Sequence, residues 1–295
     1  MSQKTGNIIS DRATNILYGK EVSEKIESEI SSKVAHLNAQ NITPMLAILR
    51  IGENPADMAY ENAVIKRASK LGISTKQFAL PHDVSQSKVL SCIDQINDDD
   101  NIHGALIFRP FPEGLDDNLI RNRLAASKDL DAITDEALAL VFTGKAKNYP
   151  CTAMACVELL KHYKIPLSGQ VVLVLGRSLV IGKPVSMLMQ RGNATVIMAH
   201  SKTTSERLKK LSAVSDVVIV ATGRSDTFGK EYAQNGQIII DVGMNRTDDG
   251  RLVGDVSFDE VADVVDAITP VPKGVGSVTT ACLLKQLVES AEKNG

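Results

Sequence analysis

The residues best suited to chemistry in this chain begin in the segment VVLVLGRSLVIGKP, which runs from Val171 to Pro184. An apolar run stops at Gly176, a polar turn of Arg177 and Ser178 follows, and Gly182 opens a helical pattern. Proteins with alternating strands and helices hold phosphate at such turns, because glycine lets the backbone approach the ligand and the helix N-terminus offers free N–H groups. Ser178 stands where the second glycine of G-x-G-x-x-G would be, so an ordinary strand–turn–helix corner is the alternative.

The next apolar run, residues 194–199, is followed directly by the tetrad HSKT. A dinucleotide fold that prefers NAD places an acidic residue near this point, about 20 residues after the turn, to bind the ribose hydroxyls. Here His200 and Ser201 are followed by Lys202, and Arg177 adds a second cation nearby. The pattern favours NADP, whose 2′-phosphate would suit these cations. A surface histidine is the alternative for His200.

Composition bounds the class of protein. A chain of 295 residues is long enough for about two domains, and its net charge of -2 argues against a nucleic-acid-binding surface. The sequence has no apolar run of about 18 residues and no apolar core of a secretory signal at its N-terminus. Its cysteines are Cys92, Cys151, Cys156 and Cys282. Because they show neither Cys-x-x-Cys pairing nor histidine partners at metal spacing, we predict reduced, mostly buried cysteines, no metal site and a cytoplasmic protein.

The elements that must position these residues alternate along the chain. Residues 1–15 are polar and aperiodic, which predicts a loose tail. In the first half, hydrophobic periodicity predicts helices over 19–39, 56–71, 84–96 and 115–124, and strands over 45–52, 76–80 and 104–108.

In the second half, the predicted strands are 171–175, 194–199, 216–221 and 237–242. Helical patterns separate the first three, which predicts a parallel sheet of the Rossmann type. Two of these strands end in glycine turns, at Gly223 and Gly243. The turns should face one ligand, because the carboxyl ends of parallel strands line one crevice. A glycine-rich loop, PVPKGVGSVT, precedes a final helix over 279–293.

The motifs now add up in order: GENPA with Tyr60, RPFP, KDLD before YPCT, GRSxxxGKP, DVVIVATG, IIDVGMN and ITPVPKGVGSVT. From Gly19 to about Glu289 the chain resembles the bifunctional methylenetetrahydrofolate dehydrogenase/cyclohydrolase (FolD-type) family of one-carbon metabolism. The resemblance implies two α/β domains flanking a cleft, a final helix that packs back onto the first domain, a homodimer, and NADP on the GRS turn with folate in the cleft. The expected folate-binding catalytic domain is 16–150 with 278–295, and the expected NADP-binding Rossmann-type domain is 151–277.

The resemblance also assigns residues. Tyr60 matches the folate-site tyrosine, and Asp131 matches the aspartate that holds the pterin; alone, Asp131 would equally suit a turn-capping role. A pterin presents adjacent N–H donors, which a carboxylate can accept. The glycine-rich loop adds the expected substrate-binding residues Pro272, Lys273, Gly274 and Gly276. The expected cofactor-binding residues are Gly176, Arg177, Ser178, Gly182, His200, Ser201, Gly223, Met244 and Thr279.

Departures from the family pattern lie mostly on the folate side. Val64 stands where the family has its catalytic lysine, and Phe108 where it has a glutamine. In the glycine-rich loop, Lys273 replaces a glycine, Ser277 a proline and Val278 a methionine. Lys66 cannot stand in for the lysine, because at about 100° per residue it points to the opposite side of the helix from position 64.

The two family reactions make different demands. Dehydrogenation takes a hydride from the methylene carbon between two folate nitrogens, so no protein group has to accept a proton. Hydrolysis of the methenyl product needs general acid–base steps, which Val64 and Phe108 cannot perform. We therefore expect an NADP-dependent 5,10-methylenetetrahydrofolate dehydrogenase whose cyclohydrolase activity is weak or lost.

Three alternatives stay open. The protein is bifunctional if Lys273 supplies the missing proton, in which case hydrolysis should vanish in Lys273→Ala. It is a dehydrogenase of another substrate if Lys273, Arg109 and Phe108 reshape the cleft so that tetrahydrofolate derivatives do not bind. It is a non-catalytic nucleotide-binding paralogue if NADP binds without turnover of any folate.

Overall fold

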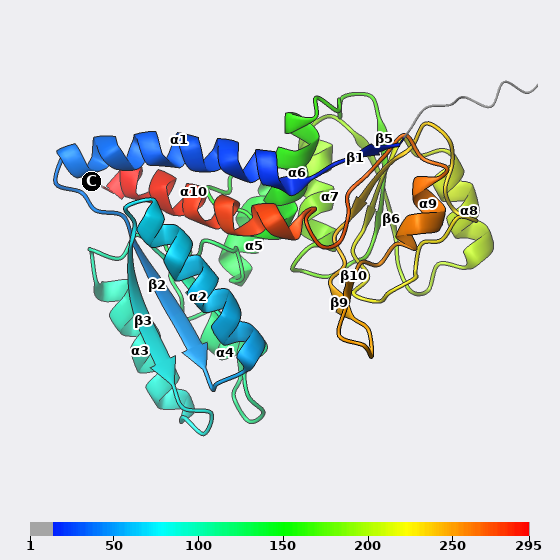
Figure 1. Ribbon diagram of the computed structural model, residues 1–295. Coiled ribbons are helices and arrows are strands. Elements are labelled where there is room, and N and C mark those ends of the chain that lie inside the picture. The colour runs from blue at the N-terminus through cyan, green and yellow to red at the C-terminus, as the bar shows by residue number, and fades with distance from the viewer. Residues whose placement is uncertain (1–13, 295) are drawn as a thin grey trace, which may run out of the picture.

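A computed structural model describes residues 14–294 of the chain, so the tail expected over 1–15 lies almost wholly outside the described residues. Two parallel sheets form the centres of two lobes (Figure 1). This arrangement confirms the predicted α/β class with two units.

The first lobe is built on a three-stranded parallel sheet in the order β3-β2-β4. Its strands are β2 (Met45–Ile51), β3 (Ser74–Leu80) and β4 (Gly104–Ile107), and its helices are α2 (Pro55–Lys70), α3 (Gln86–Asp98), α4 (Asp117–Arg121) and α5 (Asp135–Thr143). The central strand β2 is apolar on both faces, with Leu46 to Leu49 fully buried, because helices cover both sides of a parallel sheet.

The second lobe is built on a six-stranded sheet in the order β1-β11-β8-β7-β5-β6, and every pairing in it is parallel. Its strands are β1 (Asn15–Ile16), β5 (Val171–Leu175), β6 (Thr195–Ala199), β7 (Val217–Val220), β8 (Ile238–Asp241) and β11 (Ala267–Ile268). The accompanying elements are α7 (Gly182–Arg191), α8 (Ser205–Ala213), α9 (Phe258–Ala262) and the hairpin of β9 (Asn245–Arg246) and β10 (Leu252–Val253).

The parallel Rossmann-type sheet is therefore confirmed. The sequence predicted four of its six strands. The unpredicted strands β1 and β11 have two residues each, which is too short to show an alternating pattern. They complete one edge of the sheet, where Asn15 pairs with Ala267.

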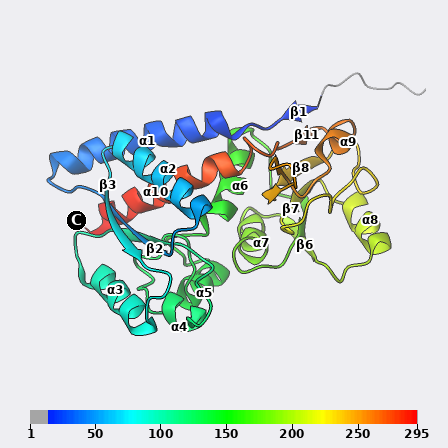
Figure 2. The same ribbon diagram turned by 60° about the horizontal axis from the view of Figure 1, so that its bottom comes forward.

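Three helices join the lobes: α1 (Gly19–Ala39), α6 (Cys151–His162) and α10 (Gly276–Asn294). In both ribbon views α1 and α10 lie side by side (Figures 1 and 2). One core cluster contains residues of α1 and α10 together with Leu46 of β2 and Val172 of β5. The final helix thus packs back on the first lobe as predicted, although it begins at Gly276 rather than Thr279.

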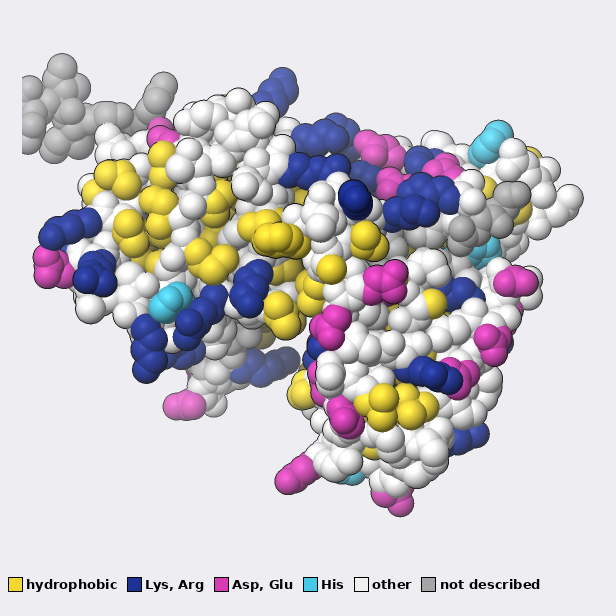
Figure 3. Space-filling view, turned by 180° about the vertical axis from the view of Figure 1, so that it is seen from behind, with side chains coloured by type: hydrophobic (Ala, Val, Ile, Leu, Met, Phe, Trp, Pro, Cys, Tyr) yellow, Lys and Arg dark blue, Asp and Glu magenta, His cyan; other side chains and the backbone are white. Residues whose placement is uncertain are grey.

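The predicted face of α1 is the buried one, since Val22, Ile26, Ile30 and Val34 are all in the core. Seen from behind, charged side chains follow the upper edge of the molecule, hydrophobic side chains gather on the second lobe, and a notch divides the two lobes (Figure 3). Among the described helices, none combines the length and apolar character that crossing a lipid bilayer requires.

Candidate active site between the two lobes

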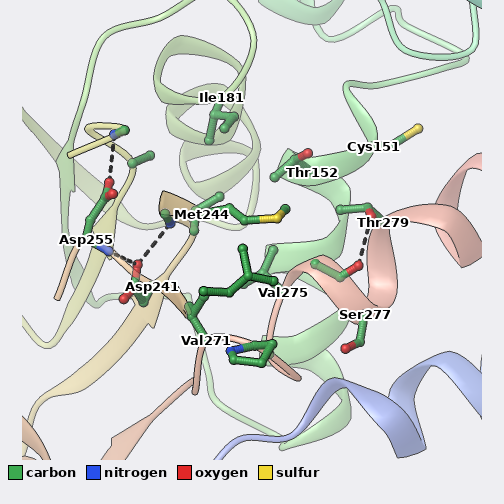
Figure 4. Close-up of a pocket in the computed structure, with 18 of the residues that line it drawn as sticks. Cys151, Thr152, Ile181, Asp241, Met244, Asp255, Val271, Val275, Ser277 and Thr279 are labelled. Atoms are coloured by element: carbon green, nitrogen blue, oxygen red, sulfur yellow. Dashed lines mark hydrogen bonds between the residues drawn. The ribbon is translucent and has the colours of Figure 1, made fainter. Parts of the chain in front are cut away.

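A cavity of about 770 Å³ lies between the lobes. Ten of the residues expected to bind substrate or cofactor line it: Tyr60, Asp131, Ser178, Gly223, Met244, Pro272, Lys273, Gly274, Gly276 and Thr279. In the close-up, Met244 reaches toward the middle of the cavity between Ile181 on one side and Val275 on the other (Figure 4). Both glycine turns predicted to share a crevice, at Gly223 and Gly243, do line this one cavity.

Five expected cofactor residues are not part of the cavity wall: Gly176, Arg177, Gly182, His200 and Ser201. Gly176 and Arg177 follow β5, His200 and Ser201 follow β6, and Gly182 begins α7. The N–H of Gly176 donates to the carbonyl of Ala199 over 2.9 Å, which ties the turn after β5 to the end of β6. His200 and Ser201, which come directly after Ala199, therefore lie next to the GRS turn.

The turn after β5 needs glycine for steric reasons. Gly176 has φ +144°, and a Cβ built there would lie 2.3 Å from the carbonyl oxygen of Ala221. A Cβ at Gly182 would lie 2.4 Å from the carbonyl oxygen of Gly176. The turn after β5 therefore lies directly against Gly182, the first residue of α7. Ser178 Oγ accepts there from the N–H groups of Ile181 at 3.1 Å and Gly182 at 3.4 Å.

Tyr60 projects from α2, and its hydroxyl accepts a hydrogen bond from Thr280 Oγ1 of α10 over 3.5 Å. Burial raises the pKa of Tyr60 above its usual range, so its hydroxyl stays protonated at neutral pH. The ring of Phe108 packs edge-on against the tyrosine ring, with centroids 5.9 Å apart and planes at 70°. Tyr60 lines the cavity, and Phe108 packs behind it without being part of the cavity wall.

Val64 lies one helical turn after Tyr60 and is fully buried in the shared core, and it is not part of the cavity wall. Phe108 packs against the same core cluster. Lys66 is exposed, as expected for a solvated surface lysine on the opposite side of α2. The two positions that the resemblance matches to the family's lysine and glutamine therefore contribute to apolar packing.

Asp131 comes two residues after Asp129, which forms a bridge with Ala105 of β4, and it lines the cavity. Its Oδ1 accepts from the backbone N–H of Cys151, the first residue of α6, over 2.7 Å. Burial raises the pKa of this carboxyl group, and Asp129 raises it further. The turn-capping alternative describes Asp129 better, because its carboxylate accepts from the N–H groups of Ile133 and Thr134 and lies away from the cavity.

The sequence prediction missed two carboxylates of the cavity wall, Asp241 and Asp255. Asp241 accepts from the N–H groups of Gly243, Asp255 and Val256, and Asp255 accepts from Thr222 and Gly223. The pair therefore fixes the loops after β7 and β8, including the segment that presents Met244. Asp241 belongs to the motif IIDVGMN and Asp255 to the later segment GDV, but only the fold shows that they meet.

Asp241 makes the folding stability depend on pH. Burial raises its pKa from 3.8 to about 6, so protonation favours the folded state. This contribution is fully present below about pH 4 and is lost as the pH rises through 6. We expect the free energy of unfolding of the wild type, relative to Asp241→Asn, to grow by about 2–3 kcal/mol between pH 7 and pH 4. Urea denaturation measures this, and parallel pH profiles of the two proteins would contradict it.

All four cysteines are free and buried, as predicted. Cys151 lines the cavity, but its sulfur points away from Met244 (Figure 4) and donates to the carbonyl of Leu130 over 3.7 Å. Burial raises the pKa of Cys151 strongly, which makes it a poor nucleophile. Within residues 14–294, no group of three or more His, Cys, Asp or Glu side chains is arranged to hold a metal ion.

Two family profiles cover most of the chain. Residues 17–131 match the tetrahydrofolate dehydrogenase/cyclohydrolase catalytic domain, and residues 150–295 match the NAD(P)-binding domain of the same family. The bifunctional protein FolD of Clostridium botulinum (strain Langeland) is 43% identical over 282 residues, which cover 95% of this chain and 99% of that protein.

Solved structures give the same result. The bifunctional FolD methylenetetrahydrofolate dehydrogenase/cyclohydrolase of Campylobacter jejuni superimposes with a TM-score of 0.92 at 34% identity, covering 95% of this chain and 99% of that one. FolD of Trypanosoma brucei, described as complexed with NADP cofactor and inhibitor, has a TM-score of 0.89 at 28% identity, covering 95% and 98%. This chain is therefore a member of the tetrahydrofolate dehydrogenase/cyclohydrolase family.

Proposed function

We propose that this protein oxidises 5,10-methylenetetrahydrofolate with NADP as hydride acceptor. The observation that carries the proposal is the single cavity in which Tyr60 and Asp131 of the first lobe face Ser178 and Met244 of the second. We place the folate-binding catalytic unit in residues 16–150 with 278–295 and the NADP-binding unit in 151–277. The homodimer that the resemblance implies remains a prediction.

The residues of the second lobe suit a dinucleotide with a 2′-phosphate. The close backbone approach at Gly176 leaves room for a pyrophosphate at the start of α7, where the helix dipole favours an anion. Arg177 is exposed beside this turn and makes no ion pair with another residue of the described chain. The tetrad after β6 supplies Lys202 and lacks an acidic residue. The relative complexed with NADP supports the same cofactor.

The chain's contribution to dehydrogenation is positioning. Asp131 would accept hydrogen bonds from the pterin donors, and Tyr60 would pack against the folate between the lobes. NADP, when bound, supplies the hydride acceptor. Because the folate nitrogens stabilise the cation that forms on the methylene carbon, the site needs no proton acceptor for this step. Apolar residues at positions 64 and 108 therefore leave the dehydrogenase step intact.

Hydrolysis of the methenyl product is the second candidate activity. The relatives are named bifunctional, and these comparisons favour the bifunctional alternative over loss of hydrolysis. The packing of Val64 and Phe108 supports slow hydrolysis, because neither residue can transfer a proton. We propose dehydrogenation as the main activity, with hydrolysis weak unless another group supplies the proton.

Initial rates of cofactor reduction with 5,10-methylenetetrahydrofolate test the dehydrogenase proposal. We expect turnover with NADP at a lower KM than with NAD. Binding of NADP without turnover of the folate would favour the non-catalytic paralogue, and failure to bind tetrahydrofolate would favour a different substrate.

Arg177→Ala should raise the KM for NADP about tenfold, because a charge-assisted hydrogen bond to the 2′-phosphate contributes about 1.5 kcal/mol. The KM for NAD should change less than twofold, since NAD lacks that phosphate. Lys209→Ala, an exposed lysine of α8, is the matched loss of charge elsewhere on the same lobe. An equal rise for both cofactors would mean that Arg177 does not contact the 2′-phosphate.

A further inference from the structure

Lys273 adopts a backbone conformation that lysine disfavours. Its φ is +83°, in the left-handed region where residues other than glycine are strained. The conformation is held in place, because the carbonyl of Lys273 accepts from the N–H of Gly19 at the start of α1 over 2.8 Å. A glycine would meet the same backbone requirement without strain. Side chains kept in such positions are candidates for function.

Lys273 is also the one cation among the described residues that line the cavity. Asp131, Asp241 and Asp255 give the same wall three carboxylates. None of them pairs with Lys273, since no ion pair of this lysine occurs in residues 14–294. Their oxygens are engaged elsewhere, by the N–H of Cys151 for Asp131 and by loop N–H groups for Asp241 and Asp255.

The ammonium group is therefore available to an anion that enters the cavity. Lys273 is exposed, whereas the neighbouring Gly274 and Val275 are buried, so the lysine stands at the rim of the cavity. Asp131 lies against the first residue of α6 and is half-buried, on the inner side. A ligand whose pterin meets Asp131 would extend its other end toward the rim.

Given the function proposed above, we propose that Lys273 binds the carboxylates of the folate's glutamate tail and sets a preference for tails with several glutamates. Folate carries its pterin at one end and one or more glutamate residues at the other, so its negative charge grows with tail length. A nucleotide phosphate offers the same anionic chemistry and is the competing source. The two sources differ in which ligand loses affinity when Lys273 is replaced.

The test compares three variants by calorimetric titration with tetrahydrofolate monoglutamate, tetrahydrofolate triglutamate and NADP. Lys273→Met removes the charge, Lys273→Arg keeps it, and Lys273→Gly removes the side chain and relieves the positive φ. Lys20→Met, which replaces an exposed lysine in the first turn of α1, controls for net charge. Circular dichroism melts confirm folding, and Lys273→Gly should fold at least as well as the wild type.

We expect Lys273→Met and Lys273→Gly to raise the Kd for the triglutamate about fivefold and the Kd for the monoglutamate about twofold. Lys273→Arg and Lys20→Met should stay within twofold of the wild type, and NADP affinity should not change in any variant. The salt dependence of triglutamate binding should also weaken when the charge is lost.

Three results would overturn the proposal. A rise in the Kd for NADP with unchanged folate affinity would assign Lys273 to a cofactor phosphate. Unchanged affinity for all ligands would show that the lysine has no binding role. This holds also if the variant loses hydrolysis while every affinity is kept. Equal losses for monoglutamate and triglutamate would exclude a preference for longer tails. Failure of the proposed function is distinct, because the wild type itself would then bind no tetrahydrofolate.

Discussion

Lysine at position 64 together with glutamine at position 108 should increase hydrolysis of 5,10-methenyltetrahydrofolate at least about 10²-fold over the wild type. Val64 lies one turn after Tyr60 on α2, and Phe108 packs edge-on against that tyrosine. The double variant would place a proton donor one helical turn from the tyrosine and an amide against its ring. General acid–base groups contribute about 10²–10⁴-fold, which sets the expected gain.

The single variants should behave differently. Val64→Lys alone puts an ammonium group into a fully buried position of the shared core, so we expect a loss of stability of a few kcal/mol, about 2 or more. Phe108→Gln opens the space that the ammonium needs, so the double variant should recover part of that loss. Decay of methenyl absorbance above the uncatalysed rate measures hydrolysis. The apolar double variant Val64→Met/Phe108→Leu is the control for repacking.

A folded double variant that gains no hydrolysis would show that the site has diverged beyond these two positions. Fast hydrolysis by the wild type that vanishes in Lys273→Ala would instead support the bifunctional alternative with a replacement proton donor. The dehydrogenase rate should change less than about tenfold in every variant of positions 64 and 108, because that step transfers no proton to the protein.

Asp131→Asn should lower kcat/KM for methylenetetrahydrofolate about 10²–10³-fold, the range of a lost charge-assisted contact in a buried site. One carboxylate oxygen of Asp131 accepts from Cys151, and the cavity-facing carboxylate can accept from the pterin. An asparagine would place its NH2 group, a hydrogen-bond donor, opposite the N–H donors of the pterin. NADP affinity should stay unchanged, since the expected cofactor residues Ser178 and Met244 of the cavity wall lie on the other lobe.

Asp129→Asn is the matched control, because it changes the neighbouring aspartate of the same KDLD motif. Asp129 holds the turn before α5 and lies away from the cavity. Its replacement should therefore lower the melting temperature and have little effect on kcat/KM. Equal kinetic losses in both variants would contradict a binding role for Asp131. Burial raises the pKa of Asp131, so its carboxylate is protonated earlier as the pH is lowered. On acidification, kcat/KM of the wild type should therefore begin to fall at a higher pH than it would with an ordinary aspartate.

The sequence predicted the long elements well and the short ones poorly. The bounds of α1 and β5 agree with the structure because their apolar patterns run over many residues or end at a glycine. The strands β1 and β11 went unpredicted because two residues carry no period. The last helix begins earlier than predicted, since part of the glycine-rich loop is helical from Gly276.

The site was predictable where strand ends carry glycine turns. Gly223 and Gly243 share a cavity because the carboxyl ends of parallel strands meet at one edge of the sheet. Asp241 and Asp255 were not predictable, because their roles depend on backbone N–H groups that only the folded loops bring to them. The burial of Val64 likewise appears only when α1, α2 and α10 are packed together.

The most direct test of the central claim follows two products at once in the wild-type reaction. Purified protein is mixed with 5,10-methylenetetrahydrofolate and NADP, and reduced cofactor and methenyltetrahydrofolate are recorded separately. We predict reduced cofactor with accumulating methenyl product, which is the result expected if dehydrogenation proceeds and hydrolysis is slow as proposed. Reduced cofactor with methenyl product that disappears well above the uncatalysed rate would contradict this prediction and would establish a bifunctional enzyme with a different proton donor.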